Sequence, residues 1–530
     1  MNYWDRMKQT WNLIKSKPSL SPDFDLDKVK IYFNNGDANR AYQVLTEQTC
    51  VDLNLDDFFI HINKTFSCVG QQYLYDRLRR IPLETSIAED DKVLQFLKEH
   101  KDATERIKKF LSKLSHMNAY SISTLFQKSH PEISSVMKTL LKILQFLPML
   151  SIVFLIIFQH VFFLITTCIF FVVNMIFHYR NKMILSAYLH SVPQFFRLVS
   201  VAKKISSEKP FDQFRPEIKK SLQSIQSLIN DLSYFKYEDK VANESAMIFF
   251  LGKELLNIFF LLEPNILFRS FRLLEEKKSD IENIFSYVGH IDMLQSLAHI
   301  QEDFPYYCKP RWTETGLHAI DVYHPLIEDC VANTLNTNGK SILLTGSNMS
   351  GKTTFIRTIA LNVLCAAALN MCFSRSFNCR RMMIHSAINL HDNLLESKSF
   401  YMKEVLAVKQ MLEKSQKNGD NLFLLDEIFK GTNTPERIAS GKAVLSELAK
   451  NGNIVFASTH DIELADLLAG EYELYHFCEQ IETDRLYFDY LLKHGKLKYR
   501  NAIRLLEIEG YPPSVIAEAK LIAGTNHSTK

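Results

Sequence analysis

The stretch SILLTGSNMSGKTTFIRTIALNVL, residues 341–364, decides the fold of the C-terminal part of this chain. Its first five residues form a short apolar run that predicts a buried strand, and residues 353–364 predict a helix. Between them, residues 346–353 match the pattern G-x-x-x-x-G-K-[ST] without a gap. A glycine-rich loop in that position lets backbone N–H groups surround phosphates at the positive end of a helix. The sequence therefore predicts a nucleotide-binding P-loop.

The residues of this loop have expected parts in binding ATP and Mg²⁺. Lys352 should contact the β- and γ-phosphates, and the hydroxyl of Thr353 should ligate Mg²⁺. A chance match with the correct strand and helix on either side is rare. The expected nucleotide contacts in the loop are Gly346, Ser347, Asn348, Met349, Ser350, Gly351, Lys352, Thr353 and Thr354.

Two later apolar runs end in side chains that could complete a hydrolytic site. Residues 421–427, NLFLLDE, read as a buried strand with Asp426 and Glu427 at its carboxyl end, where ligands bind in open α/β sheets. Asp426 should hold Mg²⁺ through water, and Glu427 should polarise the attacking water as a general base. Residues 453–459, NIVFAST, are followed by His460, which could hold that water or sense the γ-phosphate. A lone histidine is more often structural, but its place after this strand favours the functional interpretation.

The alternation of these runs with helical patterns gives the fold class. After Pro305 it is typical of a mostly parallel α/β sheet with buried strands. We therefore expect an α/β P-loop (ABC-type) ATPase domain at residues 305–530, preceded by an all-α part. The expected division upstream is an N-terminal segment at 1–50, helices at 51–142, an apolar segment at 143–179 and further helices at 180–304.

The apolar segment contains no Asp, Glu, Lys or Arg from Ile143 to Tyr179, which is a membrane signal. As one straight helix these 37 residues, 143 to 179 inclusive, would reach roughly 55 Å, whereas the hydrocarbon core is about 30 Å thick. A hairpin of two helices turning near Gln159 and His160 fits better. Lys138, Lys142, Arg180 and Lys182 flank the segment, which favours both ends lying in the cytoplasm. The competing interpretation is a very apolar pair of core helices in a soluble domain.

Composition excludes some classes of protein. Hydrophobic residues make up 47% and charged residues 23%, so the chain is not disordered on average, and a net charge of +3 neither demands nor excludes a nucleic-acid partner. The nine cysteines include no C-x-x-C pair, which indicates reduced thiols in a cytosolic setting rather than a metal site. The polar start of the chain predicts no secretory signal.

The amino-acid sequences of these motifs resemble those of the ATPase domain of the MutS DNA mismatch-repair family. The segments that carry the resemblance are TGSNMSGKTTFIRTIA (345–360), LLDEIFKGTNTPERIASGKAVL (424–445), FASTHDIELADL (456–467) and the tail NAIRLLEIEGYPPSVIAEAKLI (501–522). Residues 399–404, SFYMKE, look like the segment that completes the neighbouring subunit's nucleotide site in that family. The resemblance therefore implies a homodimer or a paralogous heterodimer, Ser399 on the γ-phosphate in trans, and residues 331–333, beginning with Val331, against the adenine. More weakly, residues 52–83 resemble the start of the family's lever-forming core domain.

The sequence departs from the family at the parts that handle DNA. Little chain precedes the core-like helices, so we expect no mismatch-reading or connector domain in this sequence. The family's mismatch-reading Phe-x-Glu triplet occurs here only as Phe477-Cys-Glu479, inside the ATPase domain. Where family members carry a DNA clamp at the lever tip, this chain has the charge-free apolar segment, which has no Lys or Arg for phosphates.

Three functions compete on these observations. The first is a MutS-like ATPase acting on DNA, in which a dimer binds two ATP molecules and hydrolysis moves the levers. The second is a membrane-anchored ATPase switch without mismatch recognition, with its ATPase domain in the cytoplasm and residues 143–179 in the inner or cell membrane. The third, the nucleotide-binding subunit of a transporter, is disfavoured because the apolar segment is too short for a permease and the motif wording differs.

Overall fold

The computed structural model describes two compact units of this chain, and each is considered by itself. One unit comprises residues 1–37, 63–76 and 86–300, and the other comprises residues 38–62, 77–85 and 301–530. The structure describes residues 24–525 apart from 38–40, 84–86, 131–133, 187, 189–190, 210, 212–213, 234–251, 253, 348, 390–399, 418–419, 483–484, 498–502, 504–505 and 508–509.

The first unit is helical, and its centre is the close contact between α5 (Cys68–Arg79) and α16 (Lys278–Asp303). A Cβ atom on Gly70 would lie 2.1 Å from a carboxylate oxygen of Asp292, and one on Gly289 would lie 2.6 Å from the Cβ of Tyr73. Only glycine lets the two helices approach this closely. Further helices of this unit are α2 (Leu26–Asn34), α6 (Ile87–Glu99), α7 (Lys101–Leu111), α8 (Thr124–Gln127), α11 (Ser191–Ile205), α12 (Ile218–Ser224), α13 (Gln226–Ser233) and α15 (Leu262–Glu276), with the 3₁₀ helices η2 (Ser112–Leu114) and η3 (Met117–Ser123).

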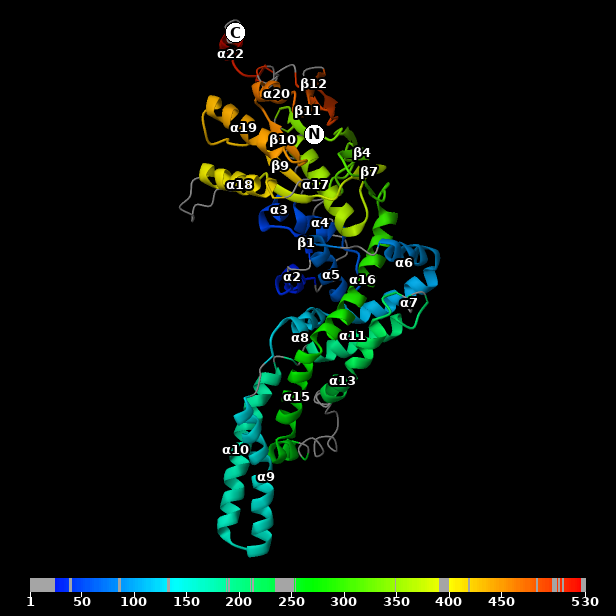
Figure 1. The fold of residues 1–530 in the computed structure, drawn as a ribbon, viewed down its shortest axis with the longest axis vertical. Helices are drawn as coiled ribbons and strands as arrows, with labels where there is room; N and C mark the ends of the chain where they lie inside the picture. The colour runs from blue at the N-terminus through cyan, green and yellow to red at the C-terminus, as the bar shows by residue number, and fades with distance from the viewer. Residues whose placement is uncertain are drawn as a thin grey trace. The chain divides into compact units, whose positions relative to one another are not determined.

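The apolar segment folds as a helical hairpin in the same unit. Its legs α9 (Ser135–Phe158) and α10 (Val161–Ser186) lie side by side (Figure 1, cyan). The turn falls at Gln159 and His160, as predicted: Gln159 adopts φ +46°, and the His160 ring accepts a hydrogen bond from the N–H of Phe162 at 3.2 Å. At the base of the hairpin, Leu141 and Leu144 pack with Leu261 in a small buried cluster.

The second unit is built on a six-stranded sheet in the order β14-β11-β6-β10-β9-β8. Five neighbouring strands are parallel, and β14 pairs antiparallel with β11 at one edge. The central strands are buried on both faces, as their continuous apolar runs predict. The strands are β6 (Ser341–Thr345), β8 (Met383–Ala387), β9 (Asn421–Asp426), β10 (Ile454–Thr459), β11 (Tyr472–His476) and β14 (Lys493–His494).

Helices cover both faces of this sheet. On one face Leu343, Phe423 and Val455 form a buried core with side chains from α18 (Phe400–Ser415), α19 (Thr434–Leu448) and α20 (Ile462–Leu468). The helix α17 (Lys352–Leu369), which follows the P-loop, contacts β9 and β10 and is buried almost all round. The second unit also contains the helices α3 (Glu47–Asp52), α4 (Leu55–Ile62) and α22 (Pro513–Thr525). A second sheet has four strands in the order β3 (Arg311–Trp312), β7 (Ser376–Cys379), β4 (Leu317–Val322) and β5 (Asn333–Asn336). Two further strand pairs are β1 (Ala41–Val44) with β2 (Arg80–Pro82), and β12 (Glu479–Glu482) with β13 (Arg485–Phe488).

This grouping differs from the expected division near residue 50. Residues 41–62 belong to the second unit, because they form hydrogen bonds with β8 and with the residues that follow it. The Gln43 amide group exchanges two hydrogen bonds with the backbone of Ile384, at 2.7 and 2.8 Å. Asp52 is fully buried and accepts hydrogen bonds from the hydroxyl of Ser386 at 2.6 Å and from the N–H of Asn389 at 2.8 Å. Sequence periodicity could not show these contacts, because the partners lie more than 300 residues apart.

Candidate active site

The P-loop follows the central strand β6 and leads directly into α17. Gly346 and Gly351 adopt φ +153° and +108°, and a Cβ on Gly346 would lie only 2.7 Å from the carbonyl oxygen of Phe477. The ammonium of Lys352 donates to the carbonyl oxygens of Gly346 and Ser347, both at 2.8 Å. Burial lowers the pKa of Lys352, although nearby carboxylates oppose this shift. The ammonium thus lies inside the loop, where the phosphates of a nucleotide are expected.

Asp426 lies opposite the first turn of α17. The hydroxyl of Thr353 donates to Asp426 Oδ2 at 2.8 Å. The hydroxyl of Ser458 donates to Asp426 Oδ1, because the parallel register of β9 and β10 places the two residues side by side. The structure therefore brings together the two residues that the sequence predicted as Mg²⁺ ligands.

The residues present fit a Mg²⁺ ion that arrives with a nucleotide. A hydroxyl and a carboxylate that face each other are the hard oxygen donors that Mg²⁺ takes, and this ion usually keeps water and phosphate oxygens as its other ligands. Within the described ranges, no group of three or more His, Cys, Asp or Glu side chains could hold a metal ion. Thr353 and Asp426 would therefore share the ion with phosphates rather than enclose it.

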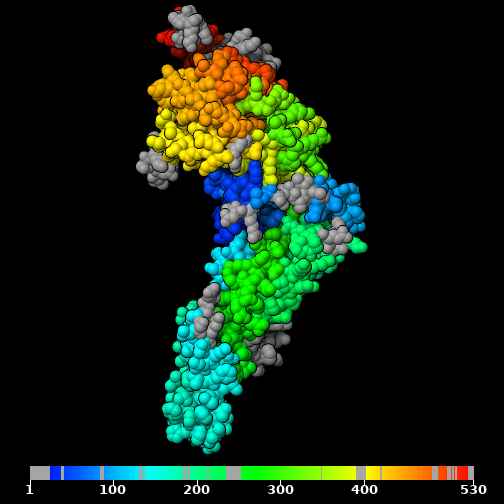
Figure 2. Space-filling model, in the orientation of Figure 1, coloured from blue at the N-terminus to red at the C-terminus, as the bar shows by residue number. Residues whose placement is uncertain are grey.

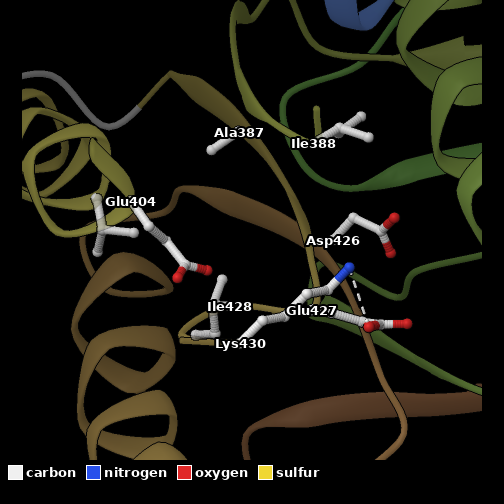
Figure 3. Close-up of a pocket in the computed structure, with 8 residues that line it drawn as sticks. Ala387, Ile388, Glu404, Asp426, Glu427, Ile428 and Lys430 are labelled. Atoms are coloured by element: carbon white, nitrogen blue, oxygen red, sulfur yellow. Dashed lines mark ion pairs between the residues drawn. The ribbon is translucent and has the colours of Figure 1, made fainter. Parts of the chain in front are cut away.

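Glu427 lies next to Asp426, and its carboxylate is held between the side chains of His460 and Lys430. Its Oε1 contacts Nε2 of His460, and its Oε2 lies 3.0 Å from Nζ of Lys430 (Figure 3). Burial alone would raise the pKa of Glu427, but the hydrogen bonds from His460 and Lys430 outweigh burial and lower the pKa to about 2. The carboxylate is therefore ionised at neutral pH, and the predicted base and the predicted histidine form one pair.

The other loop residues that were predicted to contact the nucleotide differ in their exposure and in their hydrogen-bond partners. The side chain of Met349 is 60% exposed with φ +70°. The hydroxyl of Ser347 donates to Glu479 at 2.6 Å, and that of Ser350 donates to the carbonyl of Ser347 at 2.8 Å. Thr354 is half-buried in the first turn of α17. Asn348 and Ser399 lie outside the described residues, so their predicted roles stay predictions.

Val331, predicted beside the adenine, belongs to a wall next to the P-loop. The amide of Asn333 donates to the carbonyls of Val331 and Tyr490, at 3.2 and 3.1 Å, and accepts from the N–H of Leu492 at 2.7 Å. A Cβ on Gly351 would lie 3.3 Å from the ring of Tyr490. Asn333 thus holds an aromatic ring against the loop, close to the half-exposed Val331.

Four residues near the P-loop were not predicted from the sequence to belong to the site. Lys430 follows Glu427 by one turn, and Ser458 is paired with Asp426, so strand order and turn geometry would have found both. Tyr490 and Glu479 come from a distant part of the chain, and no sequence signal connects them with the P-loop.

The site and the sheet define the C-terminal unit as a P-loop nucleotide-binding domain, in which the predicted hydrolytic residues meet at the carboxyl ends of β6, β9 and β10. Residues 342–525 match the family model described as MutS domain V, which is the P-loop ATPase domain of that family. Residues 342–525 therefore belong to the MutS domain V family.

Similar proteins support this assignment over part of the chain. It is 31% identical to the DNA mismatch repair protein MutS of Listeria monocytogenes serotype 4b (strain CLIP80459) over 261 residues, which cover 46% of this chain and 29% of that protein. It is 30% identical to the human MutS protein homolog 4 over 253 residues, which cover 44% of this chain and 26% of that protein. The chain therefore spans less than a third of the length of these relatives.

Proposed function

We propose that this chain hydrolyses ATP at the site formed by the P-loop, Asp426, Glu427 and His460. The observation that carries the proposal is the meeting of three groups at one edge of a buried sheet. These groups are the ammonium of Lys352 inside the loop, the Thr353–Asp426 pair, and the Glu427–His460 pair. Together they offer a phosphate cradle, a cation site and an ionised carboxylate.

Each residue has a role that follows from its position. Lys352 would exchange its two carbonyl partners for the β- and γ-phosphates of ATP. Thr353 and Asp426 would hold Mg²⁺, which supplies charge neutralisation on the phosphates when it is bound. Glu427 would orient and polarise a water whose oxygen bonds to the γ-phosphorus, while the bond from that phosphorus to ADP breaks and the water's proton passes to Glu427. His460 would keep the Glu427 carboxylate in place.

The test is ATP turnover by the full chain and two variants. Lys352→Ala removes the phosphate contact, so turnover and ATP affinity should both fall to background. Glu427→Gln removes the base, so kcat should fall by roughly 100-fold or more while ATP still binds. The exposed residues Lys450 and Glu463 supply the controls Lys450→Ala and Glu463→Gln, which should behave as the unsubstituted chain. Normal turnover in either site variant would refute the assignment.

The subunit arrangement and the partners rest on the resemblance to the MutS family. It implies a homodimer or a paralogous heterodimer through the ATPase domains, with Ser399 reaching the partner's nucleotide. Mismatched DNA is the substrate that the names of the bacterial relatives suggest. Both the dimer and the DNA remain proposals for this chain.

A specific observation favours the second candidate function, in which the hairpin enters a membrane. The spans Thr139–Phe158 and Val161–Asn181 have 20 and 21 residues and are strongly apolar, and only 22% and 17% of their most apolar 18 residues are buried. At 1.5 Å per residue, each span is about 30 Å long, which matches the hydrocarbon core of a bilayer. A third apolar helix, Lys352–Leu369, is 83% buried and belongs to the core of the ATPase unit.

The exposed surface of the hairpin has the character expected of lipid-facing helices. Large apolar side chains near the turn are more than half exposed, among them Ile156, Ile157 and Ile165. The cyan hairpin in Figure 2 presents this tip on the face shown. Inside the hairpin, the hydroxyls of Ser151 and Thr167 share a hydrogen bond at 2.8 Å, a polar contact of the kind that joins helices in membranes. We therefore propose that residues 143–179 anchor the chain in the inner or cell membrane, with the ATPase unit in the cytoplasm.

Alkaline extraction of cell membranes tests this anchor. The full chain should stay in the membrane pellet, because two apolar spans of 20 and 21 residues would lose their lipid contacts on release. The triple variant Met149→Glu, Leu150→Glu and Val172→Glu should be released, since these exposed residues lie near the middle of the two spans, where a charged side chain costs about 2.5–3.5 kcal/mol. Complete release of the unsubstituted chain would contradict the anchor without affecting the ATPase proposal.

A further inference from the structure

The loop that carries Glu427 has an unusual backbone. Glu427 and Phe429 adopt φ +52° and +61°, so two residues with large side chains occupy the left-handed region within three positions. Residues other than Gly, Asn and Asp rarely adopt this conformation, and they keep it only where the surrounding structure holds it. The position of the Glu427 carboxylate therefore depends on whatever holds residues 427–431.

The helix α18 supplies the first contact that holds this loop. Glu404 is 4% exposed, and its carboxylate oxygen Oε1 accepts a hydrogen bond from the N–H of Phe429. Figure 3 shows the Glu404 side chain running from its helix toward the loop at Ile428. Burial raises the pKa of Glu404, although the backbone N–H groups of Phe429 and Lys430 oppose this rise. A buried carboxyl group directed at backbone donors acts as a cap on the loop.

Tyr401, one turn earlier on α18, supplies a second contact. Its ring meets the ring of Phe429 edge to face, with a centroid distance of 6.3 Å. A Cβ atom on Gly431 would lie 2.9 Å from the Cβ of Tyr401, so the helix touches the far end of the loop without space for a side chain. The loop is thus held by α18 at Phe429 and at Gly431, on the C-terminal side of Glu427.

From these contacts we infer that Glu404 is a positioning residue for Glu427. Glu404 lines a small pocket together with Asp426 and Glu427. It acts by holding the N–H of Phe429, and so the backbone turn that aims the Glu427 carboxylate at His460. This inference rests on the proposed ATPase function. Loss of the cap lets the strained turn relax and moves the base, and a displacement of about 1 Å can cost roughly 100-fold in rate.

Steady-state ATP turnover by the full chain separates positioning from simple stability. In Glu404→Ala, kcat should fall roughly 10- to 100-fold while KM for ATP stays within about twofold, because the P-loop is untouched. In Glu404→Gln, the amide oxygen can still accept from Phe429, so most of kcat should return. Glu413 lies exposed on the same helix and pairs with Lys409 at 3.9 Å, so Glu413→Ala is the matched control and should leave both constants unchanged.

A second variant tests the same contact from the side of the loop. Gly431→Ala introduces a methyl group against Tyr401, so it should push α18 from the loop and lower kcat with little change in KM. The inference is overturned if Glu404→Ala turns over ATP at the unsubstituted rate, or if Glu404→Ala unfolds and Gly431→Ala keeps full kcat. If the unsubstituted chain itself hydrolyses no ATP, the proposed function fails instead, which distinguishes the two outcomes.

Discussion

Asp426 accepts hydrogen bonds from two hydroxyls that reach it from different elements, Thr353 at the start of α17 and Ser458 at the end of β10. The two bonds fix both carboxylate oxygens before any cation arrives. Groups that orient a metal ligand in this way usually matter to metal affinity. Ser458 is therefore part of the cation site although it is not itself an expected ligand.

Ser458→Ala should raise the Mg²⁺ concentration that gives half-maximal ATP turnover by roughly tenfold, because Asp426 becomes free to turn away from Thr353. The measurement is a Mg²⁺ titration at saturating ATP. Ser440→Ala, at an exposed position on α19, serves as the control. A titration curve that coincides with that of the unsubstituted chain would show that Thr353 alone positions Asp426.

At this scale the sequence predicts most of the site. Lys352, Thr353, Asp426, Glu427 and His460 follow buried apolar runs, and parallel strands place the residues at their carboxyl ends together. The sequence does not predict Lys430 against Glu427 or Tyr490 against Gly351. The first contact depends on the left-handed backbone at Glu427, and the second joins residues 139 positions apart.

Asp292 of α16 caps the start of α5, and this contact joins the two central helices of the first unit. Its carboxylate accepts from the N–H groups of Phe66 and Ser67, both at 2.9 Å, and from the Ser67 hydroxyl at 2.5 Å. Burial raises the pKa of Asp292 to about 6, and these three hydrogen bonds only partly oppose the rise. The first unit therefore contains a buried carboxyl group that titrates near neutral pH.

The sign of the resulting pH dependence follows from the raised pKa. Because the folded state binds this proton more tightly than the unfolded state, the contribution of Asp292 to the free energy of unfolding falls as pH rises from about 4 to 6. The full change is on the order of 2–3 kcal/mol. Asp292→Asn cannot titrate, so its stability relative to the unsubstituted chain should improve by that amount between pH 4 and pH 7.

Chemical unfolding of the two proteins at several pH values measures this difference. Asp102→Asn, at an exposed position on α7, is the control and should show no pH-dependent difference. If the free energies of unfolding of Asp292→Asn and of the unsubstituted chain differ by the same amount at every pH, Asp292 titrates at its ordinary pKa in the folded state.

At the scale of elements, the sequence predicts whether a segment is helix or strand better than it predicts the residues at which each helix or strand begins and ends. The helical spacing of residues 51–80 predicts helix, and the structure divides that region into the end of α3, α4 and α5, with Asn54 at φ +51° between the first two. The strands β1 and β2 were missed because each is short and pairs only with the other, about 40 residues away. Hairpin legs and buried parallel strands were predicted because their signals are local.

At the scale of the whole molecule, the chain combines a MutS domain V with an exposed apolar hairpin. Hydropathy alone would count α17 as a third membrane helix, and only burial separates it from the legs of the hairpin. Residues 342–525 match MutS domain V. The hairpin has no Lys or Arg between Ile143 and Tyr179 with which to hold DNA phosphates.

The central proposal is that this chain, which carries a MutS domain V, is held at a membrane by its apolar hairpin and does not recognise mismatched DNA. The most direct measurement consists of two binding assays on the purified chain. Flotation measures binding to liposomes, and a titration at two salt concentrations measures binding to mismatched duplex DNA. The account predicts that the chain floats with liposomes through its hairpin and binds the mismatched duplex no better than a matched one. A chain that stays at the bottom of the gradient, and that binds the mismatched duplex preferentially with an affinity falling steeply as salt rises, would contradict it.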